Sequence, residues 1–239
     1  PAVPASLRPD LPFILNQGQV ADDSVLFHTR TFSGAAFVKK NGAIVYTIAG
    51  AARPDVSGQA VRALAVIEEM LLGARNIQPA GVEPASARIN FLLGSPEQWR
   101  LNTPSFNAVC LPEVYEGVKL ELRAHANNIE KIFTIAPNAD PAQIRMQLAG
   151  IAQLSVNDRG ELVARSALGD IRFTKPIAWQ ETDTTRRQNV EVAYAVDGVS
   201  FGFQLGAYDP ARPLMIDPLL AGTFIGGSGA DVMSAMAQD

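Results

Sequence analysis

The stretch VYEGVKLELRAHANNIEKIFTIAPNADPAQIRMQLAG, residues 114–150, decides the fold class of this chain. Apolar and charged side chains alternate along residues 118–123. Residues 129–135 alternate in the same way, and one face of that run carries Ile129, Lys131, Phe133 and Ile135. A period of two is typical of a strand that buries one of its faces. We therefore predict two β-strands in this stretch.

The residues between and after these runs predict a hairpin and a third strand. Asn127-Asn128 separates the two runs, and asparagine tolerates the positive φ of a tight hairpin. The segment Ala136–Pro141 contains two prolines and interrupts the pattern. Apolar residues then recur at every second position from Ile144 to Leu148, where the third strand is expected.

Short runs of the same kind recur along the rest of the chain, between turns rich in Gly, Pro, Asn and Asp. Asn41-Gly42 is the strongest local hairpin signal. Many short strands with regularly spaced turns predict an all-β, antiparallel sandwich. The further strands are expected at residues 13–15, 25–30, 35–39, 43–48, 87–92, 152–156, 162–165, 171–174, 177–180, 190–196 and 201–205.

Three segments are less regular. Residues 51–59 are rich in Pro, Gly and Ser and predict a loop, and residues 100–109 are interpreted as a second loop. Residues 61–72 alternate like a strand, although Leu64, Ile67, Glu68 and Leu71 also fit one face of a helix. We favour a strand as far as Ile67, because the surrounding pattern is that of a sheet.

These patterns predict two sandwich lobes with an extended segment at each end. The proline-rich residues 1–12 are expected to form an extended arm. The first β-rich lobe would span residues 13–110 and the second residues 111–218, with a seam near Asn102–Pro112. Residues 219–239 would form a C-terminal extended strand segment.

The composition excludes several classes of function. The chain of 239 residues is 47% hydrophobic and carries a net charge of −4, without the basic face that nucleic-acid binding needs. No apolar run approaches the roughly 18 residues that span a bilayer, so no transmembrane segment is predicted. The chain begins with proline, and no signal peptide is predicted in it. We interpret it as a processed chain or as part of a longer one.

The sequence contains no constellation that predicts catalysis, a metal site or a cofactor. Cys110 is the single cysteine, and His28 and His125 lie far apart without carboxylates at ligand spacing. A hydrolase with His28 or His125 as base would need a nucleophile or carboxylate beside it. The acidic residues of the turns, Asp158, Asp170 and Asp197, predict turn capping rather than calcium binding. Glu68-Glu69 is interpreted as a solvated face.

Two tryptophans are the candidate residues for ligand binding. Trp99 and Trp179 both adjoin expected strands. Their large aromatic rings favour a role as core or interface anchors. The alternative is that one of them forms an exposed platform for a ligand such as a glycan.

A series of motifs follows one another along the chain. These signposts are Asn16–Gln19, Asn90–Gly94, Trp99–Thr103, Val114–Val118, Ala136–Pro141, Ile144-Arg145, Lys175–Gln180, Leu205–Pro210 and Pro213–Pro218. Through them the chain resembles, over about residues 11–239, the uncharacterised N-terminal domain that precedes SBBP repeats in large secreted bacterial proteins; those repeats are predicted to form β-propellers. This resemblance implies export but supplies no catalytic residues.

The segment Leu219–Asp239 resembles the first part of an SBBP repeat and is the candidate partner-binding segment. An apolar strand without a partner is an adhesive edge that can add to the sheet of a neighbouring molecule. A head-to-tail exchange of such strands would build a filament. The candidate contact residues are Leu219, Leu220, Phe224, Ile225, Val232, Met233 and Met236.

The preferred hypothesis is a non-enzymatic structural or adhesive module, extracellular or at the cell surface, that assembles by strand addition. Its partners would be further copies of the chain or another cell-surface protein. The alternative is a module that recognises a glycan or peptide and is attached to a β-propeller. Neither hypothesis requires a cofactor or a metal ion.

Overall fold

The computed structural model describes residues 11–31, 34–54, 59–92, 94–125, 128–181, 187–218 and 220–221. Within these ranges the regular structure is almost entirely β, and every strand pair is antiparallel, which confirms the predicted all-β antiparallel class. None of the described helices has the length and apolarity that crossing a membrane requires.

The described strands and 3-10 helices follow the chain in this order: β1 (Phe13–Leu15), β2 (Val25–Thr31), β3 (Gly34–Lys39), β4 (Ile44–Pro54), β5 (Ala60–Leu71), β6 (Ala80–Pro84), β7 (Ile89–Phe91), η2 (Pro96–Gln98), β8 (Arg100–Thr103), β9 (Ser105–Tyr115), β10 (Val118–His125), β11 (Asn128–Ile135), η3 (Pro141–Gln143), β12 (Met146–Ala149), β13 (Gln153–Val156), β14 (Leu162–Ser166), β15 (Gly169–Phe173), β16 (Ile177–Glu181), β17 (Arg187–Val190), β18 (Val192–Asp197), β19 (Ser200–Leu205), β20 (Leu214–Asp217) and β21 (Leu220–Ala221).

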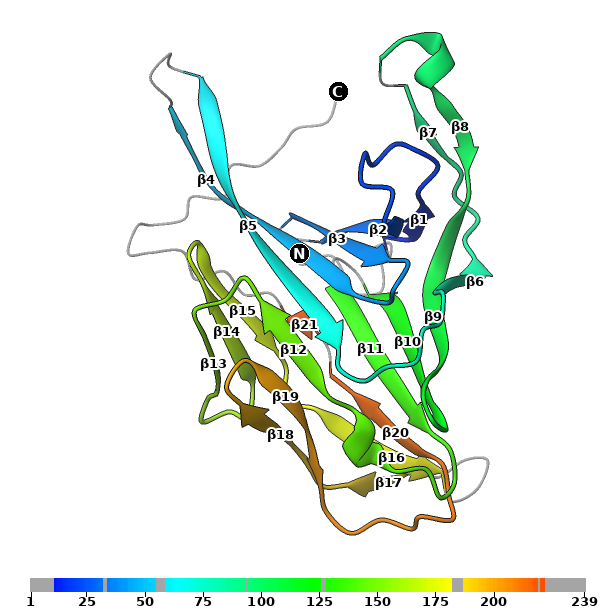
Figure 1. Ribbon diagram of the computed structural model, residues 1–239, viewed down its shortest axis with the longest axis vertical. Helices are drawn as coiled ribbons and strands as arrows, with labels where there is room; N and C mark the ends of the chain where they lie inside the picture. The colour runs from blue at the N-terminus through cyan, green and yellow to red at the C-terminus, as the bar shows by residue number, and fades with distance from the viewer. Residues whose placement is uncertain are drawn as a thin grey trace, which may run out of the picture.

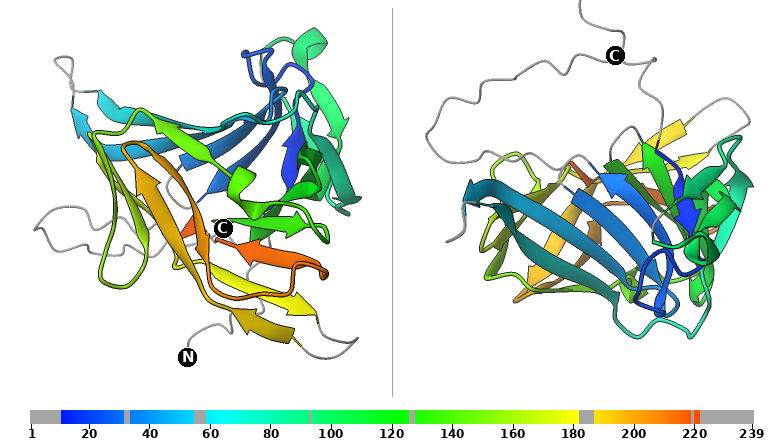
Figure 2. Two further views of the ribbon diagram at one scale, coloured as in Figure 1. Left: turned by 60° about the horizontal axis from the view of Figure 1, so that its bottom comes forward. Right: turned by 90° about the horizontal axis from the view of Figure 1, so that it is seen from above.

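One large sheet organises the molecule. Its fifteen strands follow the order β17-β16-β20-β11-β10-β9-β1-β2-β3-β4-β5-β12-β19-β18, and β6 pairs with β9 beside this path. The sheet curves into a nearly closed, barrel-like wall around a common interior (Figures 1 and 2). A four-stranded sheet, β13-β14-β15-β21, and the hairpin β7-β8 complete the described structure.

The central stretch forms the expected hairpin. β10 and β11 pair in continuous register from Val118 opposite Ile135 to His125 opposite Asn128. Buried and half-buried residues alternate along β11, which places the apolar face of the sequence pattern in the interior. The tip that was expected at Asn127-Asn128 lies partly outside the described residues, since the placed strand resumes at Asn128.

The Asn41-Gly42 hairpin is also confirmed. Gly42 has a φ of +84°, a backbone conformation that side chains with a Cβ rarely adopt. The Asn41 side chain accepts a hydrogen bond from the Ala43 N–H at 3.1 Å, and the Lys39 N–H donates to the Ala43 carbonyl at 2.8 Å. This turn sets the register of β3 against β4.

Two predictions about the β4–β5 region were wrong. The loop expected from Ala51 starts later, because β4 continues as far as Pro54; residues 55–58 lie outside the described ranges. The helical alternative for residues 61–72 is also wrong, since β5 remains a strand to Leu71. The physical reason is pairing on both sides: β4 lies along one edge of β5, and β12 pairs with its last residues.

The expected two-lobe sandwich is not confirmed. Residues 100–109, interpreted as a loop at the seam, form β8 and the first part of β9. β9 occupies most of the expected seam, from Ser105 onward, as a strand of the large sheet, where it pairs with β1, β6 and β10. Strands from both halves of the sequence therefore share one sheet.

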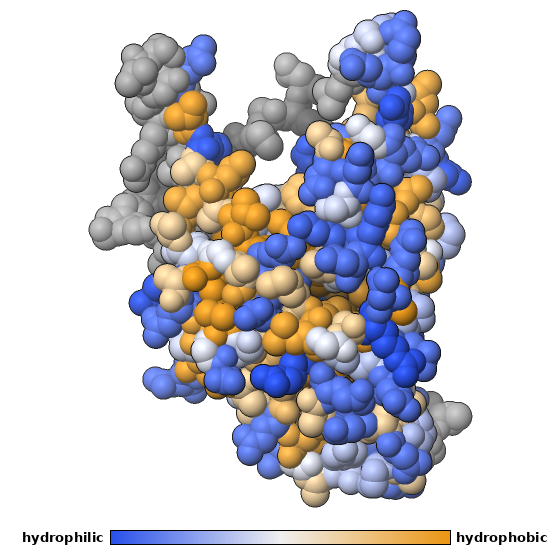
Figure 3. Space-filling view, in the orientation of Figure 1, coloured by the Kyte–Doolittle hydropathy of each residue, from blue (hydrophilic) through white to orange (hydrophobic). Residues whose placement is uncertain are grey.

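Two hairpins project from the body at the end where β4, β5, β7 and β8 lie (Figure 1). The β4–β5 hairpin exposes Val61, Leu64 and Val66, with 64% of Leu64 accessible, and apolar residues gather over this side of the molecule in Figure 3. The β7–β8 hairpin exposes Leu92, Trp99 and Leu101. Both hairpins extend beyond the part of the sheet that covers the core.

Candidate functional site

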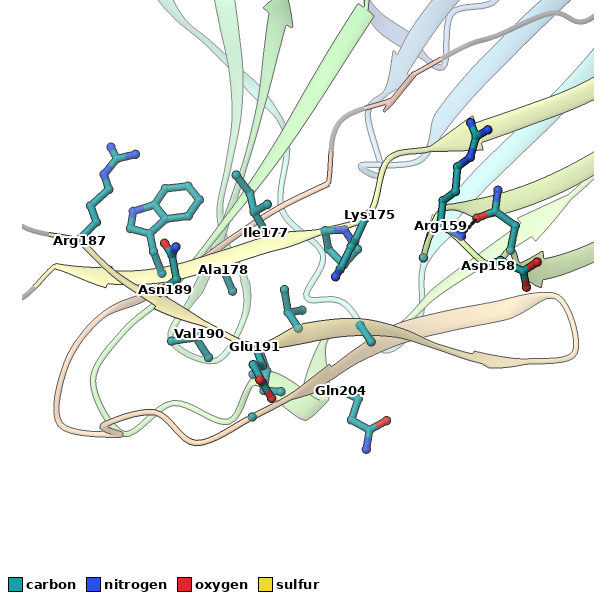
Figure 4. Close-up of a pocket in the computed structure, with 18 residues that line it drawn as sticks. Asp158, Arg159, Lys175, Ile177, Ala178, Arg187, Asn189, Val190, Glu191 and Gln204 are labelled. Carbon is teal, nitrogen blue, oxygen red and sulfur yellow. Dashed lines mark hydrogen bonds between the residues drawn. The ribbon is translucent and has the colours of Figure 1, made fainter.

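A large groove lies where the large sheet fails to close. β17 and β18 are the two end strands of this sheet, and Glu191 is the single residue that joins them. Between β16–β17 on one side and β18–β19 on the other is a groove of about 960 Å³. The turn Asn157–Gly160 closes its far end (Figure 4).

The two end strands each leave one edge without a strand partner in the described part of the chain. β17 pairs with β16 alone, and β18 pairs with β19 alone. Backbone N–H and C=O groups along such edges are a template for an additional strand. The groove is thus bounded by two edges that can accept a polypeptide.

The corner at Glu191 is held by close backbone approach. The Gly206 N–H donates to the Glu191 carbonyl at 2.8 Å. A Cβ at position 206 would lie 2.9 Å from the Cβ of Glu191, so the residue that follows β19 must be small. This contact fixes the angle at which β17 and β18 diverge.

The floor of the groove is apolar, and Trp179 is its largest side chain. Ile177, Val190 and Leu205 also contribute to it. The Arg187 guanidinium lies 4.8 Å from the centre of the Trp179 ring, a favourable cation–π arrangement. The indole N–H of Trp179 is buried and has no hydrogen-bond partner within the described ranges.

The charged side chains of the groove are mainly cationic. Arg187 lies at one end, Arg159 at the other and Lys175 between them (Figure 4). Asp158 and Glu191 are the acidic residues of the lining. Among the described ion pairs, none includes any of these three cations. With these three cations against two carboxylates, the lining has a surplus of positive charge in a chain of net charge −4.

A second polar cluster lies inside the wall of the sheet. Lys131 Nζ is 2.5 Å from Glu69 Oε1, and the Tyr46 hydroxyl donates to Glu69 Oε2 at 2.8 Å. Lys131 and Glu69 are only 1% and 2% exposed. The ammonium group also lies 4.3 Å from the centre of the Phe173 ring. Glu69 was expected on a solvated face, and that expectation was wrong because β5 turns Glu68 outward and Glu69 inward.

Burial dominates the ionisation of this cluster. It lowers the pKa of Lys131, while the Glu69 charge and hydrogen bond act in the opposite direction. Burial, together with the charge of Glu69, raises the pKa of the Tyr46 hydroxyl well above its ordinary value. A charge in such an interior persists only because its partner is in contact. Because Lys131 and Glu69 are buried and in contact with each other, we assign the pair a structural role.

A carboxyl group near the outer side of the wall has a strongly shifted pKa. Burial, followed by the charge of Glu130 and a hydrogen bond with Glu130, raises the pKa of Asp217 to about 7. The unfolded carboxyl titrates at its ordinary value of 3.8. Between these values the folded protein binds a proton that the unfolded chain lacks. The stability contributed by this group therefore falls as pH rises through this interval and is constant above it.

We expect Asp217→Asn to be more stable than the wild type at about pH 8 and close to it at about pH 4, because asparagine resembles the protonated acid. Urea denaturation of both proteins across this range measures the difference. Glu130→Gln should bring the pKa of Asp217 closer to its ordinary value, since it removes the neighbouring charge. The pH range over which stability falls should therefore become narrower. A difference between wild type and Asp217→Asn that does not vary with pH would contradict the prediction.

The two tryptophans do not come together. Trp99 follows η2 in the β7–β8 hairpin and is 40% exposed, whereas Trp179 lies in β16 at the other end of the molecule and is 9% exposed. Trp179 adjoins the groove but is too buried to offer a flat platform. Trp99 is accessible but does not line the groove.

The start of the candidate partner-binding segment pairs within its own chain. Leu220 lies opposite Phe173 and Ala221 opposite Arg172, so β21 adds to β15. The remaining candidate contacts, Leu219, Phe224, Ile225, Val232, Met233 and Met236, lie outside the described residues.

The other candidates for chemistry have structural surroundings. His28 Nε2 is 3.3 Å from the Gln19 side-chain nitrogen, its ring lies between those of Phe37 and Phe91, and burial lowers its pKa. The side chain of His125 lies outside the described residues. Burial raises the pKa of the half-buried Cys110. Within the described ranges no three His, Cys, Asp or Glu side chains gather as a metal site.

The Asn157–Gly160 turn is capped by the side chain of Asn157, the neighbour of the predicted Asp158. The Asn157 Oδ1 accepts hydrogen bonds from the Arg159 and Glu161 N–H groups, both at 3.0 Å. The two hydrogen bonds to Asn157 order the turn that closes the far end of the groove.

Two of the motifs that carry the family resemblance form hydrogen bonds that hold loops in place. The Asn16 Oδ1 accepts from the N–H groups of Gly18 and Val20 at 3.0 and 3.1 Å. The Arg100 Nε donates to the Gln17 carbonyl at 2.7 Å, which joins two signposts that are far apart in the sequence. These residues hold turns in place.

A second tie joins the Lys175–Gln180 signpost to the loop between β19 and β20. Gln180 is 2% exposed, and its Nε2 donates to the carbonyls of Asp209 and Arg212 at 2.8 and 3.2 Å. Its Oε1 accepts from the Asp209 N–H at 2.8 Å. Gln180 was not among the predicted site residues, although it lies within the Lys175–Gln180 signpost.

Comparison with known proteins identifies one family. A family model with the description "Domain of unknown function (DUF7948)" matches residues 13–219. Neither a curated protein nor a solved structure matches the chain. The match includes every strand that borders the groove.

Proposed function

We propose, on the premise that this chain belongs to the DUF7948 family, that it is a non-enzymatic binding module that takes up an extended polypeptide as an added strand. The observation that carries this proposal is the groove between β17 and β18, the two end strands of the large sheet. In strand addition, backbone hydrogen bonds provide affinity and alternate side chains provide register. The apolar floor suits one face of such a strand.

The surroundings of the candidate catalytic groups support binding rather than chemistry. The hydrogen-bonding neighbour that the described structure gives to the His28 ring is an amide, Gln19, between two aromatic rings. The buried Lys131 is engaged with Glu69. The groove brings together side chains that attract and orient a ligand, Arg159, Lys175 and Arg187 among them.

We further propose that the module is exported and serves structural or adhesive assembly at the cell surface. The resemblance of the chain to domains that precede SBBP repeats supports this placement, as does the similarity of Leu219–Asp239 to the start of such a repeat. The partners would be other copies of the chain or a second surface protein.

The second candidate is recognition of a small ligand by the same groove. A volume of about 960 Å³ lies in the range of ligand pockets, and the lining combines apolar residues with the cations Arg159, Lys175 and Arg187. The cationic lining favours an anionic peptide over a neutral glycan, because a neutral sugar does not compensate Arg159, Lys175 and Arg187.

A random-peptide library displayed on phage tests the proposal. We expect selection on the full chain to enrich peptides with alternating apolar residues, and Ala193→Trp to weaken their binding by at least about tenfold. Ala193 is an exposed residue of β18 in the groove lining, so an indole there would fill the groove without entering the core. Biolayer interferometry with the selected peptides measures the loss.

Ala195→Trp is the matched control. Ala195 lies two residues further along β18, is also exposed and does not line the groove. Peptides that bind wild type and both variants equally, or a library that yields no binder, would refute strand uptake at this groove.

A further inference from the structure

We propose that the strand taken up by the groove is residues 222–239 of a second copy of the chain, so that molecules connect head to tail. This inference rests on the proposed function and names its partner. The acceptor is the groove at Glu191, and the donor follows β21.

The charges of donor and acceptor are complementary. Residues 219–239 contain two acidic residues, Asp231 and Asp239, and no lysine or arginine. The groove holds Arg159, Lys175 and Arg187 outside any described ion pair. Contacts between these carboxylates and cations would compensate charges that the described structure leaves open.

The apolar residues of the donor match the apolar floor. Phe224-Ile225 and Val232-Met233 form two short apolar stretches, separated by the glycine-rich residues 226–229. The other terminal segment is less suitable, because residues 1–10 contain three prolines, which lack the N–H that a ladder requires, and Arg8, which adds positive charge.

The direction of the chain favours a neighbouring molecule over the chain's own groove. Asp217 lies opposite Ile177, which lines the groove, whereas Leu220 and Ala221 lie opposite Phe173 and Arg172. From Asp217 to Ala221 the chain therefore runs away from the groove. Residues 222–239 have a maximal extended length on the order of 60 Å, enough to reach a second molecule.

This exchange joins different surfaces of the two molecules. An interface of that kind is not completed within a pair of molecules, so its repeated use produces rings or open chains. Each molecule would offer one acceptor groove and one donor strand.

A pair of complementary variants tests the exchange. Ala193→Trp blocks the acceptor and keeps the donor, while Phe224→Lys/Ile225→Lys disables the donor and keeps the acceptor. We expect the wild type to form oligomers in light scattering and each variant alone to be monomeric. An equimolar mixture of the two variants should form a one-to-one complex, because it contains one working groove and one working strand. The same mixture made with Ala195→Trp in place of Ala193→Trp should form longer assemblies.

Zero-length carbodiimide cross-linking locates the contact. It joins an amine to a carboxylate, so we expect links from Lys175 to Asp231 or Asp239 in the wild-type oligomer. Mixing nitrogen-15-labelled and unlabelled chains should place the two labels on opposite sides of the link. Lys175→Arg, which keeps the charge but lacks the reactive amine, should abolish the link and keep the oligomer.

A monomeric wild type, a mixture of variants that remains apart, or links confined to single chains would overturn the inference. The proposed function fails separately: if the variants remain apart but library peptides still bind wild type and not Ala193→Trp, the groove accepts a strand from another source. If peptide binding is also indifferent to Ala193→Trp, both proposals are refuted.

Discussion

Lys131→Met is expected to lower the free energy of unfolding by about 3–5 kcal/mol. The substitution removes the ammonium group 2.5 Å from Glu69 and leaves a buried carboxylate with the Tyr46 hydroxyl as its remaining partner. The hydrophobic stem of methionine fills much the same space, so the lost packing is small. The expected loss of stability therefore comes mainly from the uncompensated charge of the Glu69 carboxylate.

Urea denaturation measures this loss, and a neighbouring ion pair provides the control. Lys39 contacts Glu68 at 2.8 Å, but its side chain is 23% exposed, so Lys39→Met should lower stability by no more than about 1 kcal/mol. Lys131→Met/Glu69→Gln should recover more than half of the loss, because glutamine is neutral and still accepts from Tyr46. A double variant as unstable as the sum of its single substitutions would contradict this explanation.

Gln180→Leu is expected to lower the free energy of unfolding by about 1–3 kcal/mol. Leucine has a similar volume but removes the bonds to the Asp209 N–H and to the carbonyls of Asp209 and Arg212. The loop between β19 and β20 would lose the side chain that ties it to β16. Its amides should also exchange with deuterium faster than in the wild type.

Gln188→Leu is the control for this prediction. Gln188 lies opposite Gln180 in the register of β16 and β17, but its side chain is exposed. The same chemical change there should leave stability within about 0.5 kcal/mol of the wild type. An equal loss at both positions would show that the effect belongs to the substitution and not to the ties.

The sequence pattern predicted many of the strands, but it missed β6, β8, β9 and β20 and did not predict how the strands are arranged. Alternation along residues 129–135 placed Lys131 on the apolar face, and the structure buries it there. Its partner could not be identified, because adjacent glutamates give no indication of which one points inward. That choice follows from the pairing of β5 with β4, a contact between distant segments.

A seam between two lobes was expected here because a short kink and a long loop have the same local composition. Asn102-Thr-Pro104 has the composition of a loop, and Asn102 does adopt a positive φ of 57°. The interruption between β8 and β9 is nevertheless a single residue, Pro104. A short kink between two strands and a loop between two lobes look the same in the sequence.

The candidate site was the least predictable feature. Trp179 was singled out from its residue type, but the groove depends on which strands end the sheet. Its cations come from the β13–β14 turn, the residues before β16 and the start of β17. No local pattern unites these segments, because the sheet order alone brings them together.

The position of β20 has a mechanical consequence. β20 is paired on one side with β11 and on the other with β16, and it comes shortly before the point where the described chain ends at Ala221. Tension applied to the residues after Ala221 would act along the axis of β20 and load both rows of backbone hydrogen bonds at once. The two residue pairs that join β21 to β15 would separate first, which would free a short length of chain. Further extension would meet the shear resistance of a strand that is hydrogen-bonded on both sides.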